Sequence, residues 1–170
     1  MSRAVLSIGS NIGDRLANLQ SAVDSFGESV IAVSPVYSTA PWGGVEQQDF
    51  LNAVVLVNDP GVDSRGWLNR AHEAEAAAER TREVRWGPRT LDVDIVTCDD
   101  VVTDDPALTL PHPRAHQRAF VLVPWLDVEP DAILTVGGQS SPIRDWLAGL
   151  PESERSGVVA TSAELRGPRS

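Results

Sequence analysis

The chain has 170 residues and 42% hydrophobic content, which is enough for one buried core and too little for two full domains. Its formal net charge of −10 argues against broad binding to nucleic acid or to an anionic membrane, which needs a basic surface. No apolar run approaches the roughly 18 residues of a membrane span, and the first residues lack a secretory pattern, so we expect a cytoplasmic protein with a small-molecule partner.

Hydrophobic periodicity predicts strands and helices in alternation along the chain. Strands are predicted at residues 4–8, 30–36, 50–57, 90–98 and 133–136. Helices are predicted at residues 15–26, 64–79, 115–126 and 142–149. Asp14 can cap the first helix and Gly27 can end it, whereas Pro124 should bend or end the third. Residues 106–113 should form an irregular connection.

Elements in this order predict a two-layer α/β domain, in which helices pack on one face of a mainly antiparallel sheet. We predict a single domain over residues 1–150 and a loosely ordered tail over residues 151–170. The turn at residues 9–13 is excluded as a Walker A phosphate loop, because it lacks the Gly-Lys-Ser/Thr ending and the chain has no lysine. The loop at residues 40–48 has a length typical of lids.

The segment at residues 85–96 carries most of the chemical information. From Thr90 onward polar and apolar residues alternate, so Asp92 and Asp94 should share one face of a strand while their apolar neighbours face a core. Their Cα atoms would lie roughly 6 to 7 Å apart, close enough for both carboxylates to reach one Mg²⁺ or a pair of ions. Such a pair suits phosphoryl chemistry.

A cluster of cations precedes these acids. All 14 basic residues are arginines, whose planar guanidinium groups bind phosphate through two parallel hydrogen bonds. Four of them lie within ten residues: Arg80, Arg82, Arg85 and Arg89. The run Trp86-Gly87-Pro88 lies among them and favours a shaped loop over an exposed helix. In an acidic chain this cluster would attract a polyanionic ligand toward the two carboxylates once a metal has neutralised them.

The segment resembles the signature of the 6-hydroxymethyl-7,8-dihydropterin pyrophosphokinase (HPPK) family. Similar landmarks follow in the family's order at residues 8–14, 37–39, 47–52 and 110–112, and the resemblance covers roughly residues 3–150. It implies a ferredoxin-like core with additions, and a catalytic domain at residues 1–150. The implied reaction, in folate biosynthesis, transfers pyrophosphate from ATP to the hydroxymethyl oxygen of the reduced pterin and releases AMP. The family uses two Mg²⁺ ions and ATP as co-substrate.

The resemblance also implies roles for individual residues. Asp92 and Asp94 would bind the metals, and Arg80 and Arg89 would meet the charge that develops on the transferred group. The residues expected to bind ATP are Arg82, Arg85, Trp86 as a closing lid residue, Ile95, Leu110, His112 and Arg118. The residues expected to bind the pterin are Thr39, Ala40 and Trp42 in the pocket lining, Phe50 and Phe120 on either side of the ring, and Asn52 at its edge.

Several positions depart from the family pattern. His72 occupies an amide position, while Glu75 matches the acid that precedes the arginine pair. Pro113 replaces a tyrosine, so one nucleotide contact is either missing or supplied elsewhere, for example by Arg118. Ala40 replaces a proline and Glu79 a glycine, which affects the two flanking loops.

Two other interpretations stay open. A nucleotide-sugar glycosyltransferase also holds a divalent cation with an Asp-x-Asp pair at a strand end, although such catalytic domains are usually larger. A non-catalytic ferredoxin-like interaction module with an acidic surface would show no Mg²⁺-dependent ATP binding. For the pyrophosphokinase interpretation we expect a monomer.

Overall fold

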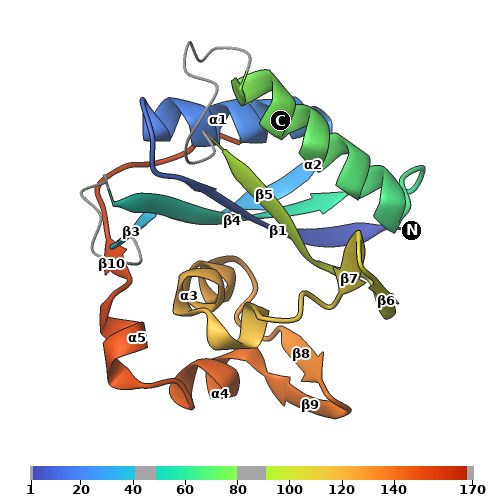
Figure 1. Cartoon of the computed structure of the whole chain (residues 1–170), viewed down its shortest axis with the longest axis vertical. Coiled ribbons are helices and arrows are strands. Elements are labelled where there is room, and N and C mark those ends of the chain that lie inside the picture. Colours follow the sequence, from blue (N-terminus) through green and yellow to red (C-terminus); the bar gives the residue numbers. More distant parts are fainter. Residues whose placement is uncertain (1, 41–48, 80–90, 168–170) are drawn as a thin grey trace.

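The computed structural model describes residues 2–40, 49–79 and 91–167 (Figure 1). The helices are α1 (Arg15–Phe26), α2 (Ser64–Glu79), α3 (Ala119–Val128), α4 (Ile143–Ala148) and α5 (Glu152–Ser156), with single 3-10 turns η1 (Gly27–Ser29) and η2 (Ala115–Gln117). The strands are β1 (Arg3–Ser10), β2 (Val30–Val33), β3 (Tyr37–Thr39), β4 (Phe50–Asn58), β5 (Asp92–Cys98), β6 (Thr103–Asp105), β7 (Leu108–Leu110), β8 (Ile133–Val136), β9 (Gln139–Pro142) and β10 (Val159–Ala160).

The central sheet has the strand order β10-β3-β4-β1-β5, with β2 also paired to β4, so the described residues contribute six strands to it. Every pairing in it is antiparallel. Since α1 leads from β1 to β2 and α2 leads from β4 to β5, both helices cross on the same face, as Figure 1 shows above the sheet. The predicted ferredoxin-like core with a mainly antiparallel sheet is confirmed.

Helices cover both faces of the sheet, which differs from the one-sided packing that the sequence predicts. Alternate residues of β1 explain this: Leu6 and Ile8 belong to a hydrophobic cluster with α1 and α2, whereas Val5 belongs to a second cluster with α3 and α4. The second cluster includes Trp125 of α3 and Leu134 of β8, which are 2% and 1% exposed. The molecule therefore has three layers, and α3 lies below the sheet in Figure 1. We call the two sides the α1 face and the α3 face.

Local signals define the ends of the first two helices. The Asp14 side chain accepts a hydrogen bond from the Ala17 N–H at 3.1 Å, and Gly27 adopts a φ of 54° at the other end of α1. Asp63 caps α2 by accepting from the Gly66 N–H at 2.8 Å. Inside α2, Trp67 is fully buried against the α1 side of the core. These boundaries agree with the sequence analysis.

The strand predicted at residues 30–36 ends earlier in the structure, and a separate strand begins just after that range. β2 ends at Val33, and Ser34 then bonds to Val54 of β4 through its N–H and its hydroxyl, at 2.9 and 2.8 Å. Pro35 follows and has no N–H to donate. The chain therefore resumes its pairing with β4 only at Tyr37, where β3 begins.

Three segments in the second half differ from the prediction. The connection expected to be irregular contains β7, which forms a hairpin with the preceding β6, and α3 continues through Pro124 to Val128. The tail expected to be loosely ordered contains α5 and β10, and β10 pairs with β3 at the edge of the sheet. Among the described residues, no helix combines the length and the apolar character that crossing a bilayer requires.

Candidate active site

Asp92 and Asp94 lie on the α3 face at the start of β5. Their neighbours Leu91, Val93 and Ile95 are 0%, 5% and 5% exposed and belong to the cluster on the α1 face, while the two aspartates are half-buried on the opposite side. The alternation in the sequence predicts this arrangement. The two carboxylates are therefore neighbours on one face of an edge strand.

The pairing of β1 brings Asn52 into line with these acids. Gly9 pairs with Asn52 on one side and with Asp92 on the other, so the three residues form one row across β4, β1 and β5. Neighbouring strands lie about 4.8 Å apart, which places Asn52 and Asp92 about 10 Å from each other. A Cβ atom on Gly9 would lie 3.0 Å from the Asn52 Oδ1. Glycine at this position therefore leaves room for the Asn52 amide.

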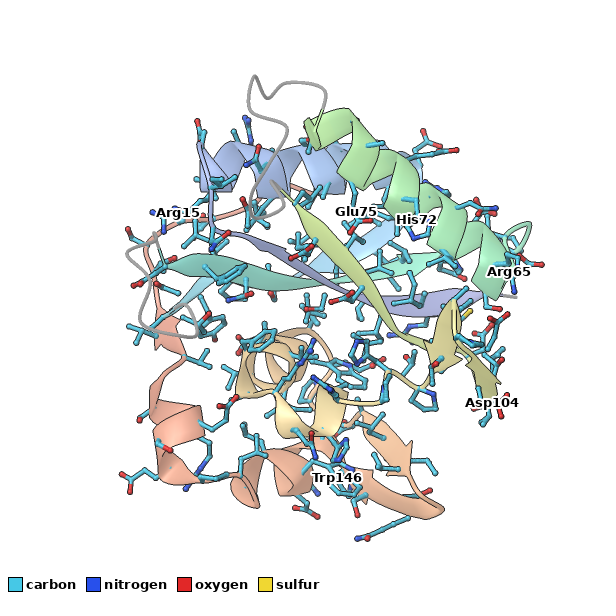
Figure 2. The ribbon with its side chains drawn as sticks, viewed as in Figure 1. Arg15, Arg65, His72, Glu75, Asp104 and Trp146 are labelled. Carbon is cyan, nitrogen blue, oxygen red and sulfur yellow. The ribbon has the colours of Figure 1, made fainter. Side chains whose placement is uncertain are left out.

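Asn52 is a buried polar side chain, with only 4% of its surface exposed. Its Nδ2 donates to the Thr39 hydroxyl at 2.8 Å, which fixes the amide against β3. Thr39 in turn pairs with Phe50, so the predicted pterin-binding residues of β3 and β4 are adjacent. Arg15 of α1 holds the residue before Phe50, because its Nη1 donates to the Asp49 carbonyl at 2.7 Å (Figure 2).

The start of α3 brings two further predicted residues to the same face. Arg118 precedes the first helical residue, and its guanidinium carbon lies 5.5 Å from the centre of the Phe120 ring. Phe120 is partly buried against the cluster on the α3 face. α3 is tied to β3 by the Tyr37 hydroxyl, which donates to the Asp127 carboxylate. β3 and α3, the two elements that would enclose a pterin, are thus connected by this hydrogen bond.

His112 lies close to Asp94. Its backbone N–H donates to the Val96 carbonyl at 2.8 Å, which ties it to β5, and its Nδ1 accepts from the Arg114 N–H at 3.1 Å. Burial lowers the pKa of His112 below its usual 6.5; nearby Asp94 opposes this, while Arg118 and Arg114 add to it. The imidazole is therefore neutral at pH 7, and with Nδ1 accepting, its proton lies on Nε2.

Glu75 of α2 forms a hydrogen bond with the backbone of β5. Its Oε2 accepts from the Val93 N–H at 3.0 Å, and Val93 stands between the two aspartates. Figure 2 shows Glu75 and His72 on α2, and His72 is exposed to solvent. The sequence analysis matched Glu75 to the family's acid but missed this contact, because no local pattern links residues 18 apart on different elements.

The remaining predicted residues divide into three groups. The side chains of Ile95 and Leu110 belong to the core on the α1 face, so only their backbone is available to a nucleotide. Ala40 is exposed at the end of the first described stretch. The others lie outside the described residues, and their roles stay predictions: Trp42, Arg80, Arg82, Arg85, Trp86 and Arg89.

The donor set suits Mg²⁺ better than a fully protein-ligated metal. No group of three or more His, Cys, Asp or Glu side chains within the described ranges could hold an ion. Mg²⁺ keeps several waters and is usually bound by one or two carboxylates together with substrate phosphates. Asp92 and Asp94 provide such a pair on an edge strand of the described sheet. A separate hollow of about 640 Å³ beside Ser2, Arg70 and Cys98 lies at the other end of β1 and contains none of the predicted site residues.

The family model of 7,8-dihydro-6-hydroxymethylpterin-pyrophosphokinase (HPPK) matches residues 5–130. The chain belongs to the HPPK family. A relative from Mycobacterium leprae, 2-amino-4-hydroxy-6-hydroxymethyldihydropteridine pyrophosphokinase, is 55% identical over all of this chain and 94% of its own length. A relative of the same name from Methylorubrum extorquens is 43% identical over 90% of this chain and 96% of its own length.

A solved structure shows the HPPK fold at much lower identity. The crystal structure of wild-type Plasmodium falciparum HPPK-DHPS superposes with a TM-score of 0.63 at 16% identity, over 86% of this chain. The present chain spans 40% of that longer protein. At this identity the likeness supports the fold alone.

Proposed function

We propose that this chain is a 2-amino-4-hydroxy-6-hydroxymethyldihydropteridine pyrophosphokinase of folate biosynthesis. It transfers pyrophosphate from ATP to 6-hydroxymethyl-7,8-dihydropterin, giving the pterin diphosphate and AMP. Membership of the HPPK family and full-length relatives of this name support the activity. The structural observation that carries the proposal is the row Asp92–Gly9–Asn52, which puts the Asp92 carboxylate and the buried Asn52 amide on one sheet face.

The products define which bonds change. Since AMP leaves and a diphosphate is transferred, the pterin hydroxymethyl oxygen bonds to the β-phosphorus of ATP, and the bond from that phosphorus to the bridging oxygen of AMP breaks. The hydroxyl proton is released to water. Such a reaction depends mainly on positioning and on electrostatic stabilisation of the transferred group.

Asp92 and Asp94 would hold two Mg²⁺ ions. Bound Mg²⁺ would neutralise phosphate charge and orient the attacking and leaving oxygens. The protein contributes by keeping both carboxylates on one face of β5 at a constant spacing. The contact between Glu75 and the Val93 N–H supports this geometry from the opposite side of β5.

On the nucleotide side, His112 and Arg118 would contact the phosphates of ATP. A neutral His112 with its proton on Nε2 can donate one hydrogen bond to a phosphate oxygen, and Arg118 can donate two in parallel. Arg80 and Arg89 would meet the developing charge. Arg82, Arg85 and Trp86 would guide and enclose ATP, while the backbone near Ile95 and Leu110 would border the adenine.

On the pterin side, Asn52 would bond the edge of the ring, and Phe50 and Phe120 would stack on its faces. Thr39 holds the Asn52 amide through the 2.8 Å bond and so presents it in one orientation. Ala40 and Trp42 would complete the lining. A cytoplasmic, monomeric enzyme remains our expectation.

Neither a nucleotide-sugar glycosyltransferase nor a non-catalytic module is favoured. The family match covers both the Asp92–Asp94 strand and the residues of β1, β3 and β4. An interaction module would give no reason for a neutral histidine and two aspartates to converge on one sheet face.

The test is pterin-dependent release of AMP in the presence of Mg²⁺. Replacing Asp94 with alanine should lower kcat by about 100-fold or more, since charge stabilisation by bound metal is lost. Asp100→Ala, an exposed acid after the end of β5, should leave the rate unchanged. Near-normal turnover of Asp94→Ala, with a wild-type circular dichroism spectrum, would contradict the metal assignment. Turnover with a sugar nucleotide and none with ATP would contradict the function itself.

A further inference from the structure

The C-terminal segment, defined as residues 151–167, contacts both elements that would enclose the pterin. We propose that this segment is a positioning element for the pterin side of the site, in which Glu154 acts through α3 and Thr161 acts through β3. The inference rests on the proposed function. It assigns a role to a part of the chain that lies beyond the family match at residues 5–130.

The first contact is at the start of α3. The Glu154 Oε1 accepts from the Ala119 N–H at 3.2 Å, and Ala119 stands between Arg118 and Phe120. The first N–H groups of a helix have no partner within the helix, and Arg118 makes no capping side-chain bond here. Glu154 therefore supplies a partner from 35 residues away and puts a carboxylate at the favourable end of the helix dipole.

The second contact is at the edge of the sheet. β10 pairs with β3, with Val159 opposite Ser38 and Ala160 opposite Tyr37. The N–H and the hydroxyl of Thr161 then both donate to the Val36 carbonyl, at 3.2 and 2.8 Å. β3 has three residues, and without β10 one of its edges would be open. β10 and Thr161 thus hold the strand that carries Thr39.

The third contact fastens the segment on the α1 face. Ala163 and Leu165 pack against the core there. Gln20 of α1 donates to the Arg166 carbonyl and accepts from the Arg166 N–H, both at 2.8 Å. Figure 1 shows the segment rising from α5, passing β10 and crossing to α1, so it encloses the β3 edge of the sheet from one face to the other.

The position of these contacts predicts which substrate they affect. β10 lies at one edge of the sheet and β5, with Asp92 and Asp94, lies at the other. Phe120 and Thr39 belong to the elements that the segment holds, whereas the metal-binding acids do not. Loosening the segment should therefore weaken pterin binding more than ATP binding or the chemical step.

The test compares steady-state constants of full-length variants. Glu154→Ala should raise the pterin KM about fivefold or more while kcat stays within about twofold, which is the pattern of lost uniform binding. Some rise in the ATP KM is expected, because Arg118 adjoins the same helix start, but the rise in the pterin KM should exceed it, because Phe120 and Thr39 both lie on elements that the segment holds. Glu154→Gln keeps an accepting oxygen and should restore most of the pterin KM. Glu152→Ala, on the same helix, is the matched control, since Glu152 is an exposed acid in the same first turn as Glu154.

Thr161→Val probes the β3 contact independently. It removes one hydroxyl and should raise the pterin KM by about two- to threefold with the ATP KM unchanged. If Glu154→Ala does not fold, this milder variant carries the same test. Lowered thermal midpoints with a pterin KM within about 1.5-fold of wild type in both variants would overturn the inference, because the segment would then only stabilise the fold. Absent pterin-dependent AMP release by the wild type would instead contradict the proposed function.

Discussion

At the residue scale, the geometry of the candidate site depends on the absence of a side chain at Gly9. Gly9 separates Asn52 from Asp92 in the cross-strand row, and a Cβ atom added to it would come within 3.0 Å of the Asn52 Oδ1. The Asn52 side chain cannot move away from Gly9 without breaking its hydrogen bond to Thr39. The row is therefore a place where one methyl group should change substrate binding.

We expect Gly9→Ala to weaken pterin binding. The added methyl group would displace the Asn52 amide by a few tenths of an ångström or more, so the pterin KM should rise about tenfold, the order expected when a positioning group moves. Steady-state kinetics with varied pterin measure this. Gly61→Ala is the control, because its Cβ would have 3.5 Å of clearance and lies in a turn remote from the row. An unchanged pterin KM would contradict the role of Asn52.

Tyr37 offers a spectroscopic test of the link between β3 and α3. Burial first, and then the hydrogen bond to Asp127 and its negative charge, raise the pKa of Tyr37 to about 12. The folded state therefore keeps this proton longer than the unfolded chain, whose tyrosine has a pKa of about 10. The resulting stability is fully present below about pH 10 and is lost as the pH rises toward about 12.

Because the chain has one tyrosine, its ionisation can be followed by near-ultraviolet absorbance without overlap from others. The midpoint should lie well above about 10 in the wild type and should fall in Asp127→Asn, which removes the charge but not the burial. Circular dichroism recorded in parallel shows whether the protein is still folded at each pH. A wild-type midpoint at about 10 in folded protein would contradict the hydrogen bond between Tyr37 and Asp127.

At the scale of elements, β5 is an edge strand that is supported from two directions. β1 pairs with one edge, and Glu75 of α2 accepts the Val93 N–H that points away from β1. The contact lies between the two aspartates, so it maintains the spacing of the proposed metal ligands. The Glu75 carboxylate thus accepts a backbone hydrogen bond of the kind that a neighbouring strand would accept.

Removal of this support should affect both stability and Mg²⁺ dependence. We expect Glu75→Ala to lower the free energy of unfolding by about 1–3 kcal/mol, since it leaves a buried N–H without its acceptor. It should also raise the Mg²⁺ concentration needed for half-maximal activity. Denaturant unfolding and a Mg²⁺ titration of AMP release measure the two effects. Glu75→Gln keeps an accepting oxygen and should be milder; an equal loss in both variants would mean that charge, and not the bond to Val93, is what matters.

At the scale of the whole molecule, one sheet joins two cores. Leu19 lies on the α1 face and Leu134 on the α3 face, and both are almost completely buried, at 0% and 1% exposed. β4 contributes to both clusters, because Val55 faces one and Val54 the other. The two layers of helices should therefore unfold together.

Two matched cavity variants test this cooperativity. Leu19→Ala and Leu134→Ala should each lower the free energy of unfolding by about 2–5 kcal/mol. Each should retain a single transition that coincides when followed by circular dichroism and by tryptophan fluorescence. Two separated transitions in Leu134→Ala would show that α3, α4 and β8 form a unit that unfolds independently of the ferredoxin-like core.

Much of the arrangement of the candidate site could be predicted from the sequence because its signals are local. The alternation from Thr90 to Val96 placed Asp92 and Asp94 on one face, and the capping residues Asp14 and Gly27 defined α1. The residue pattern also identified the family, whose match to the chain is confirmed. The arginine cluster at residues 80–89 is equally plain in the sequence, but its arrangement lies outside the described residues.

Periodicity and motifs act within a few residues, so the sequence by itself determined α1, α2, β1, β4 and β5, the shared face of Asp92 and Asp94, and the chemistry of the signature. Tertiary structure decided how these faces meet: which rows Gly9 joins, that α3 covers the second face, that Glu75 reaches Val93, and that residues 151–167 enclose the β3 edge. The physical reason is that pairing and packing depend on contacts between residues far apart in the chain. No local pattern specifies the partner of such a contact.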